Sequence, residues 1–135
     1  MRERMGELPV CVELRSPMWF QPRDRERTLD VLRELQLSLV VVDAPKSSKL
    51  PTVLEVTNDE LAVVRFHGRA DDTWSARTGT AAERFNYRYS KQQLRPWAKK
   101  LERLGNEARE VHALMNNCYR DHGVRNAAEL RTMLE

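Results

Sequence analysis

Four short segments of the chain are almost continuously apolar, and each ends in polar or charged residues. They span residues 10–15 (VCVELR), 37–45 (LSLVVVDAP), 61–69 (LAVVRFHGR) and 110–117 (EVHALMNN). Runs of this kind are typical of strands that are buried in a parallel sheet. Because ligands of α/β folds bind at the carboxyl ends of such strands, the pattern also indicates where a site would lie.

Three other segments have the apolar spacing of amphipathic helices: 22–36, 90–105 and 124–134. Ser90 and Gln93 form a capping-box pattern at the start of the second helix. Within it we expect Pro96 to introduce a kink or a 3₁₀ start, and Gly105 to end the helix. Two long connections, 43–58 and 69–89, show no helical pattern, and loops of this length are unusual and often functional.

Strands that alternate with helices predict parallel strands joined by right-handed crossovers. The 135 residues suffice for a single domain with one core, so we expect one domain over 1–135. Four parallel strands with helices on one side make half of a (β/α)₈ barrel. An open four-stranded α/β layer is the alternative architecture.

Side chains alternate between the two faces of a strand, which predicts the residues that point inward. We expect three polar sets on the inner face: Glu13 with Arg15, Asp43 with Leu39 and Val41, and Arg65 and His67 with Val63. The outer face, which packs on the helices, would then carry Val12, Leu14, Val40, Val42, Val64 and Phe66. For the last strand, either Asn116 or Asn117 points inward.

Two carboxylates lie at predicted strand ends. Glu13 with Arg15 is either a salt bridge that fixes packing, or a base or metal ligand beside a guanidinium that binds an anion. Asp43 is either a turn carboxylate that binds loop amides or a second carboxylate facing Glu13. With His67 the two carboxylates would be a conceivable metal set, although the sequence contains no metal-binding motif.

The segment 65–69 (RFHGR) is the most specific local feature. Gly68 allows a sharp turn or a close approach to a ligand. Arg65 and Arg69 carry forked donors that suit phosphate or carboxylate groups. His67 is a candidate general acid, general base or ligand, or else a buried histidine with a hydrogen-bonding role.

Amides and aromatic residues supply further candidates. Asn116 and Asn117 can bind a ligand or hold the next loop in place, and Asn126 suits a polar contact at the start of the last helix. The 69–89 loop is aromatic and basic, through Trp74, Arg77, Arg84, Phe85, Tyr87, Arg88 and Tyr89. This composition suits stacking on bases or sugars, and it equally suits a loop packed over the strand ends.

Composition narrows the classes of function. The chain carries 23 basic and 20 acidic residues, a net charge of +3 that only weakly favours anionic ligands. Two cysteines are too few for a disulfide framework or a metal knuckle. The sequence contains no P-loop, GxGxxG, HExxH or GxSxG motif. Without a signal-like segment or an apolar run of about 20 residues, we expect a cytoplasmic protein.

Several ordered motifs together resemble one known family: VELRSPMWF, VVVDAP, VVRFHGR, FNYRYS, QLRPWA and HALMNNCYRDHGVRNAAEL. They are similar to the C-terminal half of the YecE-like family, domain of unknown function 72, which has a (β/α)₈-barrel fold. The resemblance covers the chain from about Pro9 to its end. The positions that match the family pattern are Glu13, Arg15, Trp19, Asp43, Arg65, His67, Gly68, Arg69, Tyr87, Tyr89, Trp97, Asn116, Asn117, Asn126 and Ala127.

The chain departs from the family in two ways. Ser16 stands where the family often has a histidine, and the N-terminal half of the barrel, with its own site residues, is missing. The resemblance therefore implies barrel strands five to eight, with strand edges and an inner face that need a partner. A second copy of the chain or a complementary N-terminal half would supply it.

The functional hypothesis is a polar, anion-accepting site at the strand ends, in an uncharacterised barrel enzyme that hydrolyses a phosphorylated or nucleic-acid substrate. Its catalytic candidates are Glu13, Asp43 and His67, and its binding candidates are Arg15, Trp19, Arg65, Gly68, Arg69, Asn116 and Asn117. The alternatives are a non-catalytic nucleic-acid-binding module built on the 69–89 loop, and a fragment without activity of its own. The sequence identifies no cofactor or metal, and it leaves open whether the chain is an enzyme.

Overall fold

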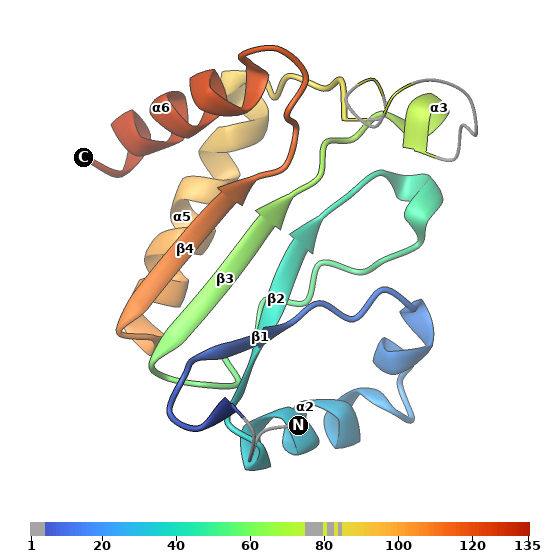
Figure 1. Cartoon of the computed structure of the whole chain (residues 1–135), viewed down its shortest axis with the longest axis vertical. Coiled ribbons are helices and arrows are strands. Elements are labelled where there is room, and N and C mark those ends of the chain that lie inside the picture. The colour runs from blue at the N-terminus through green and yellow to red at the C-terminus, as the bar shows by residue number, and fades with distance from the viewer. Residues whose placement is uncertain (1–4, 75–79, 81–82, 84) are drawn as a thin grey trace.

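A computed structural model of the chain describes residues 5–74, 80, 83 and 85–135. Its strands are β1 (Val10–Val12), β2 (Leu37–Asp43), β3 (Leu61–Phe66) and β4 (Glu110–Met115). They form one parallel sheet in the order β1-β2-β3-β4 (Figure 1). The four predicted strands and their parallel arrangement are therefore confirmed, and all the polar strand ends lie at one edge of the sheet.

The helices follow the predicted order. The main ones are α2 (Arg25–Glu34), α5 (Lys91–Glu107) and α6 (His122–Leu134). Shorter elements in the connections are the 3₁₀ turns η1 (Pro17–Phe20) and η2 (Lys46–Ser48), and α3 (Asp71–Trp74). No helix in the described ranges combines the length and the apolar character that crossing a bilayer requires.

The start of α5 is as predicted, whereas its end is not. Ser90 and Gln93 form the full capping box, with the Ser90 N–H donating to Gln93 Oε1 at 2.9 Å. The helix is continuous through Pro96, and it passes Gly105 to end two residues later, before an extended Ala108. Gly105 does not adopt the left-handed backbone conformation that ends many helices, so the expectation that it stops α5 was wrong.

The main core lies between α5 and the centre of the sheet. Leu94, Trp97, Leu101 and Leu104 are buried along one stripe of α5, and Trp97 contacts Phe66 of β3 edge-to-face at 4.9 Å. Burying an apolar side chain of this size stabilises a fold by about 1.5–3 kcal/mol. The packing anchors β3, which carries Arg65 and leads into His67, Gly68 and Arg69.

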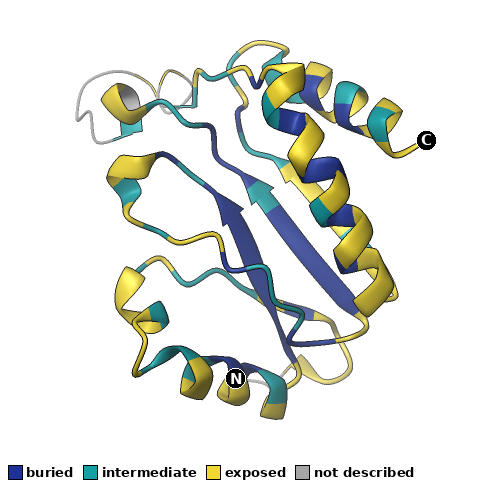
Figure 2. Cartoon of the chain, turned by 180° about the vertical axis from the view of Figure 1, so that it is seen from behind, coloured by how far each residue is buried: buried dark blue, intermediate teal, exposed yellow. Residues whose placement is uncertain are grey.

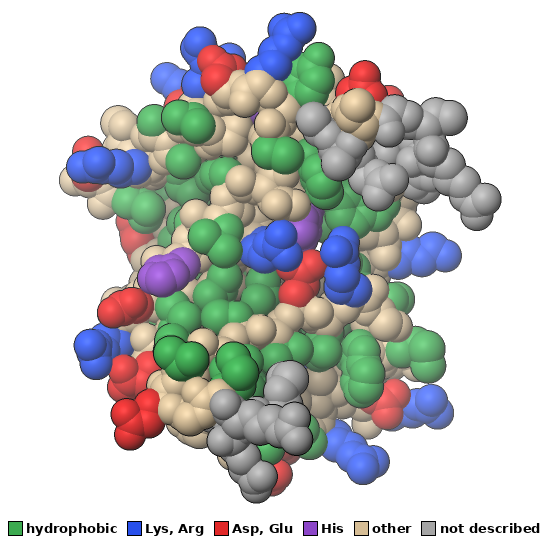
Figure 3. Space-filling view, in the orientation of Figure 1, with side chains coloured by type: hydrophobic (Ala, Val, Ile, Leu, Met, Phe, Trp, Pro, Cys, Tyr) green, Lys and Arg blue, Asp and Glu red, His purple; other side chains and the backbone are tan. Residues whose placement is uncertain are grey.

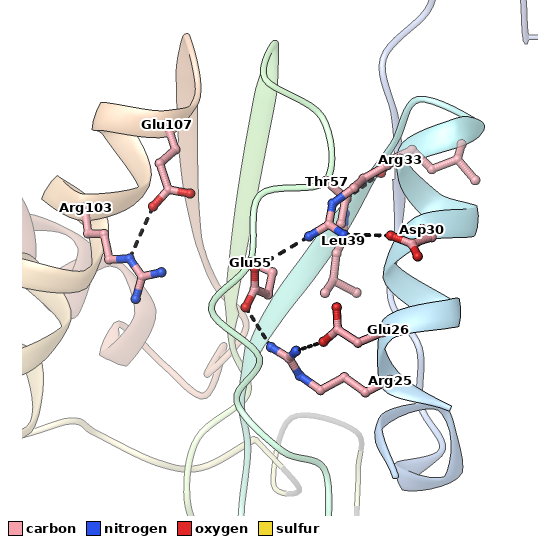
Figure 4. A network of polar contacts seen from close by, with 10 residues as sticks. Arg25, Glu26, Asp30, Arg33, Leu39, Glu55, Thr57, Arg103 and Glu107 are labelled. Atoms are coloured by element: carbon pink, nitrogen blue, oxygen red, sulfur yellow. Dashed lines mark hydrogen bonds and ion pairs between the residues drawn. The ribbon is translucent and has the colours of Figure 1, made fainter. Parts of the chain in front are cut away.

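An extended segment, rather than a helix, covers the outer face between α2 and α5 (Figure 2). It belongs to the long 43–58 connection. Val53 joins the core under α2, and Thr57 Oγ1 bonds both the Leu37 carbonyl at 2.6 Å and the Leu39 N–H at 2.8 Å. Glu55 lies close to Arg25 at 2.6 Å and Arg33 at 3.8 Å, both on α2 (Figure 4). This connection thus has a structural role.

The predicted facing of β2 was wrong. Val40 and Val42 form an apolar cluster with Leu61 and Val63 on the face opposite the helices, while Leu39 and Val41 pack in the cores under α2 and α5. Parallel pairing explains this, because Val40 lies beside Val63 and Val42 beside Arg65, and paired residues share a face. An almost continuously apolar run contains too little alternation for the facing of its side chains to be predicted.

The face opposite the helices carries a hollow of about 420 Å³. Its lining comes from all four strands and the residue after β1: Cys11, Glu13, Val40, Leu61, Val63, Arg65, His112 and Leu114. Figure 3 views this face and shows apolar side chains in its middle, with basic and acidic side chains beside them. Leu114 on β4 is 47% exposed, so the apolar inner surface is partly open to solvent.

Candidate functional site

Four polar side chains from three strand ends form a closed ring. Arg65 on β3 donates from Nη1 to Glu13 Oε2 at 2.6 Å and from Nη2 to Asn116 Oδ1 at 3.3 Å. Asn116 Nδ2 lies 3.0 Å from His67 Nδ1, and His67 Nε2 lies 3.2 Å from Glu13 Oε1. The structure therefore brings together the predicted Glu13, Arg65 and His67, and it places Asn116 rather than Asn117 among them.

The ring is mostly buried. The side chain of His67 is 1% exposed and that of Glu13 is 11% exposed. Burial by itself raises the pKa of Glu13, but the nearby His67 and Arg65 outweigh it and lower this pKa to about 2. Glu13 is thus an ionised carboxylate at neutral pH, held by its neighbours.

Arg15 and Trp74 lie over the ring. Arg15 Nε is 3.4 Å from Glu13 Oε1, its side chain is 58% exposed, and its guanidinium lies 5.8 Å from the centre of the Trp74 ring. Trp74 of α3 packs edge-to-face on His67 at 5.7 Å and contacts Phe85 at 6.4 Å. The sequence placed Trp74 in an aromatic loop but did not predict its contact with the site. The reason is that an irregular loop has no pattern that determines which part of the fold it packs against. Arg77 and Arg84 of that loop lie outside the described residues.

Asp43 belongs to a second cluster. Its carboxylate accepts from Arg69 Nε at 3.0 and 3.1 Å, and it raises the pKa of Arg69 against the opposing effect of burial. Burial and the nearby Asp43 also raise the pKa of Tyr89. Asp43 lies beside Phe66 in the sheet, on the face toward the helices. The prediction that it faces Glu13 was therefore wrong, for the same reason as the facing of β2.

Gly68 joins the two clusters through the backbone. Its φ of +88° is left-handed, and a Cβ there would lie 2.7 Å from Tyr87 Cβ. Its N–H donates to Tyr89 Oη at 2.9 Å, and the preceding His67 N–H donates to the Asp43 carbonyl at 2.8 Å. The predicted sharp turn is confirmed, and it directs His67 and Arg69 into different clusters.

Asn117 and Asn126 hold the loop before α5. Asn117 Nδ2 donates to the Tyr87 carbonyl at 2.8 Å and to Asn126 Oδ1 at 2.9 Å. Asn126 bonds both the N–H and the carbonyl of Tyr89 at 2.9 Å. Both amides are fully buried, so their contacts are structural and Asn117 does not reach the ring.

Trp19 lies apart from the ring. It belongs to η1, is 51% exposed, and lines an apolar groove of about 750 Å³ between η1 and α2. None of the four ring residues lines this groove. A binding role for Trp19 at the strand ends therefore stays a prediction.

The donor set at the strand ends does not form a metal centre. Within the described part of the chain, no three His, Cys, Asp or Glu side chains are grouped closely enough to hold a metal ion. Glu13 and His67 are adjacent, but Asp43 pairs with Arg69 elsewhere. Chemically, the ring combines an ionised carboxylate, an imidazole, an amide and one arginine, and a second arginine, Arg15, lies beside it.

Comparison with known proteins gives consistent matches. Residues 1–135 match the family described as "Protein of unknown function DUF72". The UPF0759 protein YunF of Bacillus subtilis (strain 168) is 34% identical over 121 residues, which are 86% of this chain and 43% of YunF.

Solved structures of two relatives match nearly the whole chain. Two structures of a DUF72 family protein from Enterococcus faecalis V583 have TM-scores of 0.90 and 0.86, with 32% identity, and cover 98% of this chain and 50% and 51% of the other. One from Thermotoga maritima MSB8 has a TM-score of 0.84, with 32% identity over 98% of this chain and 48% of the other. The chain thus spans about half the length of these relatives.

Proposed function

This chain belongs to the DUF72 family of proteins of unknown function, and from that premise we propose that its strand ends form a site for an anionic group, phosphate or carboxylate. The observation that carries the proposal is the ring of Glu13, Arg65, Asn116 and His67 with Arg15 beside it. Buried charged groups at the carboxyl ends of parallel strands are typical of functional sites in α/β proteins.

The balance of charge supports an anionic ligand. Arg15, Arg65 and Arg69 carry three positive charges at these strand ends, against two negative charges on Glu13 and Asp43. Arg65 and Arg69 already form ion pairs with these carboxylates. Arg15 makes only a 3.4 Å contact and is mostly exposed, so its guanidinium has donors to offer. Arg15 is therefore the side chain on which binding of an anion depends most directly.

The reaction that this set of groups suits best is hydrolysis of a phosphorylated or nucleic-acid substrate. With a pKa of about 2, Glu13 is a weak base at neutral pH, so its role is to orient His67. His67 is the residue suited to donate a proton to a leaving oxygen. Trp74 covers His67, so the substrate would have to displace or stack on that ring.

Phosphate binding to the Arg15→Ala variant tests the proposal. Titration of the chain with inorganic phosphate, followed by NMR, should show binding that the variant weakens by roughly ten- to a hundredfold, since a charge-assisted bond contributes about 1.5–3 kcal/mol. The matched control is Arg109→Ala, an exposed arginine whose ion pair with Glu60 lies at the opposite ends of the strands. Equal loss in both variants, or no binding at all, would contradict an anion site.

The same titration with a short single-stranded oligonucleotide tests the alternative of a nucleic-acid-binding module. The stacking of Arg15 on Trp74 favours that alternative, because an exposed cation beside an aromatic ring is a common contact for bases. Binding that falls steeply with salt and is insensitive to Glu13→Gln would support the module rather than the hydrolase.

We further propose that the chain forms half of a (β/α)₈ barrel. β1 pairs only with β2 and β4 only with β3 within the described residues, so the sheet has two open edges. Its hollowed inner face is partly apolar and partly exposed, and its relatives are about twice as long. A polypeptide equivalent to the remaining half of these relatives would extend both edges and enclose the ring.

A further inference from the structure

The amide of Asn116 has only one orientation that satisfies its neighbours. Arg65 can only donate hydrogen bonds, so the atom of Asn116 that faces Arg65 Nη2 at 3.3 Å must be the oxygen. The amide nitrogen Nδ2 then faces His67 Nδ1 at 3.0 Å. An amide nitrogen carries only donor hydrogens, so its partner on the imidazole has to be an acceptor.

We propose that Asn116 is a positioning residue that holds His67 as the neutral tautomer protonated on Nε2. With Nδ1 accepting from Asn116, the single proton of the neutral ring has to reside on Nε2, which lies 3.2 Å from Glu13 Oε1. Arg65 determines the orientation of the Asn116 amide, and that amide in turn determines the tautomer of His67. In this tautomer the Nε2 proton points toward the ionised carboxylate of Glu13. The orientation of an imidazole by the partner of its other nitrogen is a general feature of functional histidines.

The described surroundings of His67 supply two partners for its ring nitrogens. Among the described residues, the polar side chains that contact the imidazole are Glu13, next to β1, and Asn116, next to β4, while Trp74 of α3 packs on it edge-to-face. Asp43 reaches only the backbone N–H of His67. Both His67 Nε2 and Glu13 Oε1 are buried without an aligned hydrogen bond to any described residue, so a small shift of either would bring the proton into line.

This assignment has a chemical consequence for the site. A second proton on the imidazole would enter at Nδ1, directly against the amide hydrogens of Asn116, so the Arg65–Asn116 bond would have to break first. In the unliganded protein the four-residue ring thus favours a neutral histidine whose single proton is on Nε2, directed at Glu13. The tautomer of His67 is a property of the unliganded protein, so it does not depend on the proposed binding of an anion.

Long-range ¹H–¹⁵N NMR of the unliganded chain at neutral pH tests the proposal directly, since it identifies which imidazole nitrogen carries the proton. The signals of His112 and His122 are assigned from their Gln variants. We expect His67 to be predominantly the Nε2–H tautomer. A spectrum in which His67 is predominantly Nδ1–H, or in which the two tautomers are equally populated, would overturn the proposal, whatever the phosphate titration shows.

The Asn116→Asp variant then tests the role of the amide itself. A carboxylate can accept from both Arg65 and an Nδ1–H, so the proton should move to Nδ1 or His67 should become doubly protonated. The control is Asn106→Asp, the same change at an exposed position of α5, which should leave the His67 signals as in the wild type. If Asn116→Asp does not fold, Asn116→Ala takes its place and should populate both tautomers. An unchanged His67 spectrum in the folded variant would refute the positioning role.

Discussion

Glu13 shows how a single residue couples charge to the stability of the fold. It lies between the guanidinium of Arg65 and the imidazole of His67, in a site where an unpaired carboxylate would be unfavourable. Its partners lower the pKa from 4.5 to about 2 in spite of burial. Because the pKa is lower in the folded chain than in the unfolded one, ionised Glu13 stabilises the fold, and this stabilisation is lost on protonation.

We predict that Glu13→Gln lowers the free energy of unfolding at neutral pH, by an amount on the order of 3 kcal/mol. The gap between wild type and variant is present in full above pH 4.5 and should shrink as the pH falls toward about 2. Urea denaturation of both proteins across this range measures the gap. Glu110→Gln, at an exposed carboxylate of β4, is the control, and a gap that stays constant with pH would contradict the prediction.

At the scale of elements, the turn after β3 directs its side chains to different partners. Arg65 and His67 enter the ring, Phe66 enters the core under α5, and Arg69 pairs with Asp43. The turn depends on Gly68, whose left-handed backbone approaches Tyr87 closely. Gly105 differs, because it lies in regular helix, where an added Cβ would make an ordinary contact of 3.9 Å with Val111 Cγ2.

The two glycines therefore predict opposite effects of the same substitution. Gly68→Ala should lower the free energy of unfolding by more than about 1 kcal/mol, through its positive φ and the contact with Tyr87. Gly105→Ala should raise that free energy by about 0.5–1 kcal/mol, because alanine has less backbone entropy to lose in a helix. Thermal or urea unfolding of the two variants and the wild type measures both changes in the free energy of unfolding. A tolerated Gly68→Ala would show that the turn is not tightly constrained.

At the scale of the whole molecule, the inner face of the sheet is the least covered part. Strands β2 and β3 are buried between their neighbours, whereas Glu110, His112 and Leu114 of β4 are exposed. The outer face of the sheet is covered by α2, α5 and the extended connection, whereas the inner face has no such cover among the described residues. A partner on the inner face would bury β4 and the hollow beside the ring.

We predict a one-to-one complex between this chain and the half of YunF that it does not match, when the two are co-expressed and measured by size exclusion with light scattering. Leu114→Gln should weaken the complex while changing the stability of the isolated chain by no more than about 0.5 kcal/mol, since Leu114 is 47% exposed there. Leu134→Gln, at a residue 44% exposed near the end of α6, is the control. A homodimer of the chain alone, or a complex that Leu114→Gln does not weaken, would contradict this arrangement.

Local structure could be predicted from the sequence wherever it depends on a few neighbouring residues. The capping box of Ser90 and Gln93 formed, and so did the turn at Gly68, because each depends on neighbouring residues. The ring could be predicted in part, since Glu13 and His67 follow regular alternation from their strands. The position of Trp74 against His67 could not be predicted, because Trp74 belongs to a loop without periodic hydrophobic spacing.

The sequence by itself determined the family, the four parallel strands and the edge of the sheet where polar residues gather, since these follow from hydrophobic runs and ordered motifs. Only the tertiary structure decided which polar residues meet. Strand register turned Val40 and Val42 inward and Asp43 toward Arg69, and the end of β4 placed Asn116 rather than Asn117 in the ring. The physical reason is that the facing of an almost continuously apolar strand depends more on its neighbours in the sheet than on the residues within it.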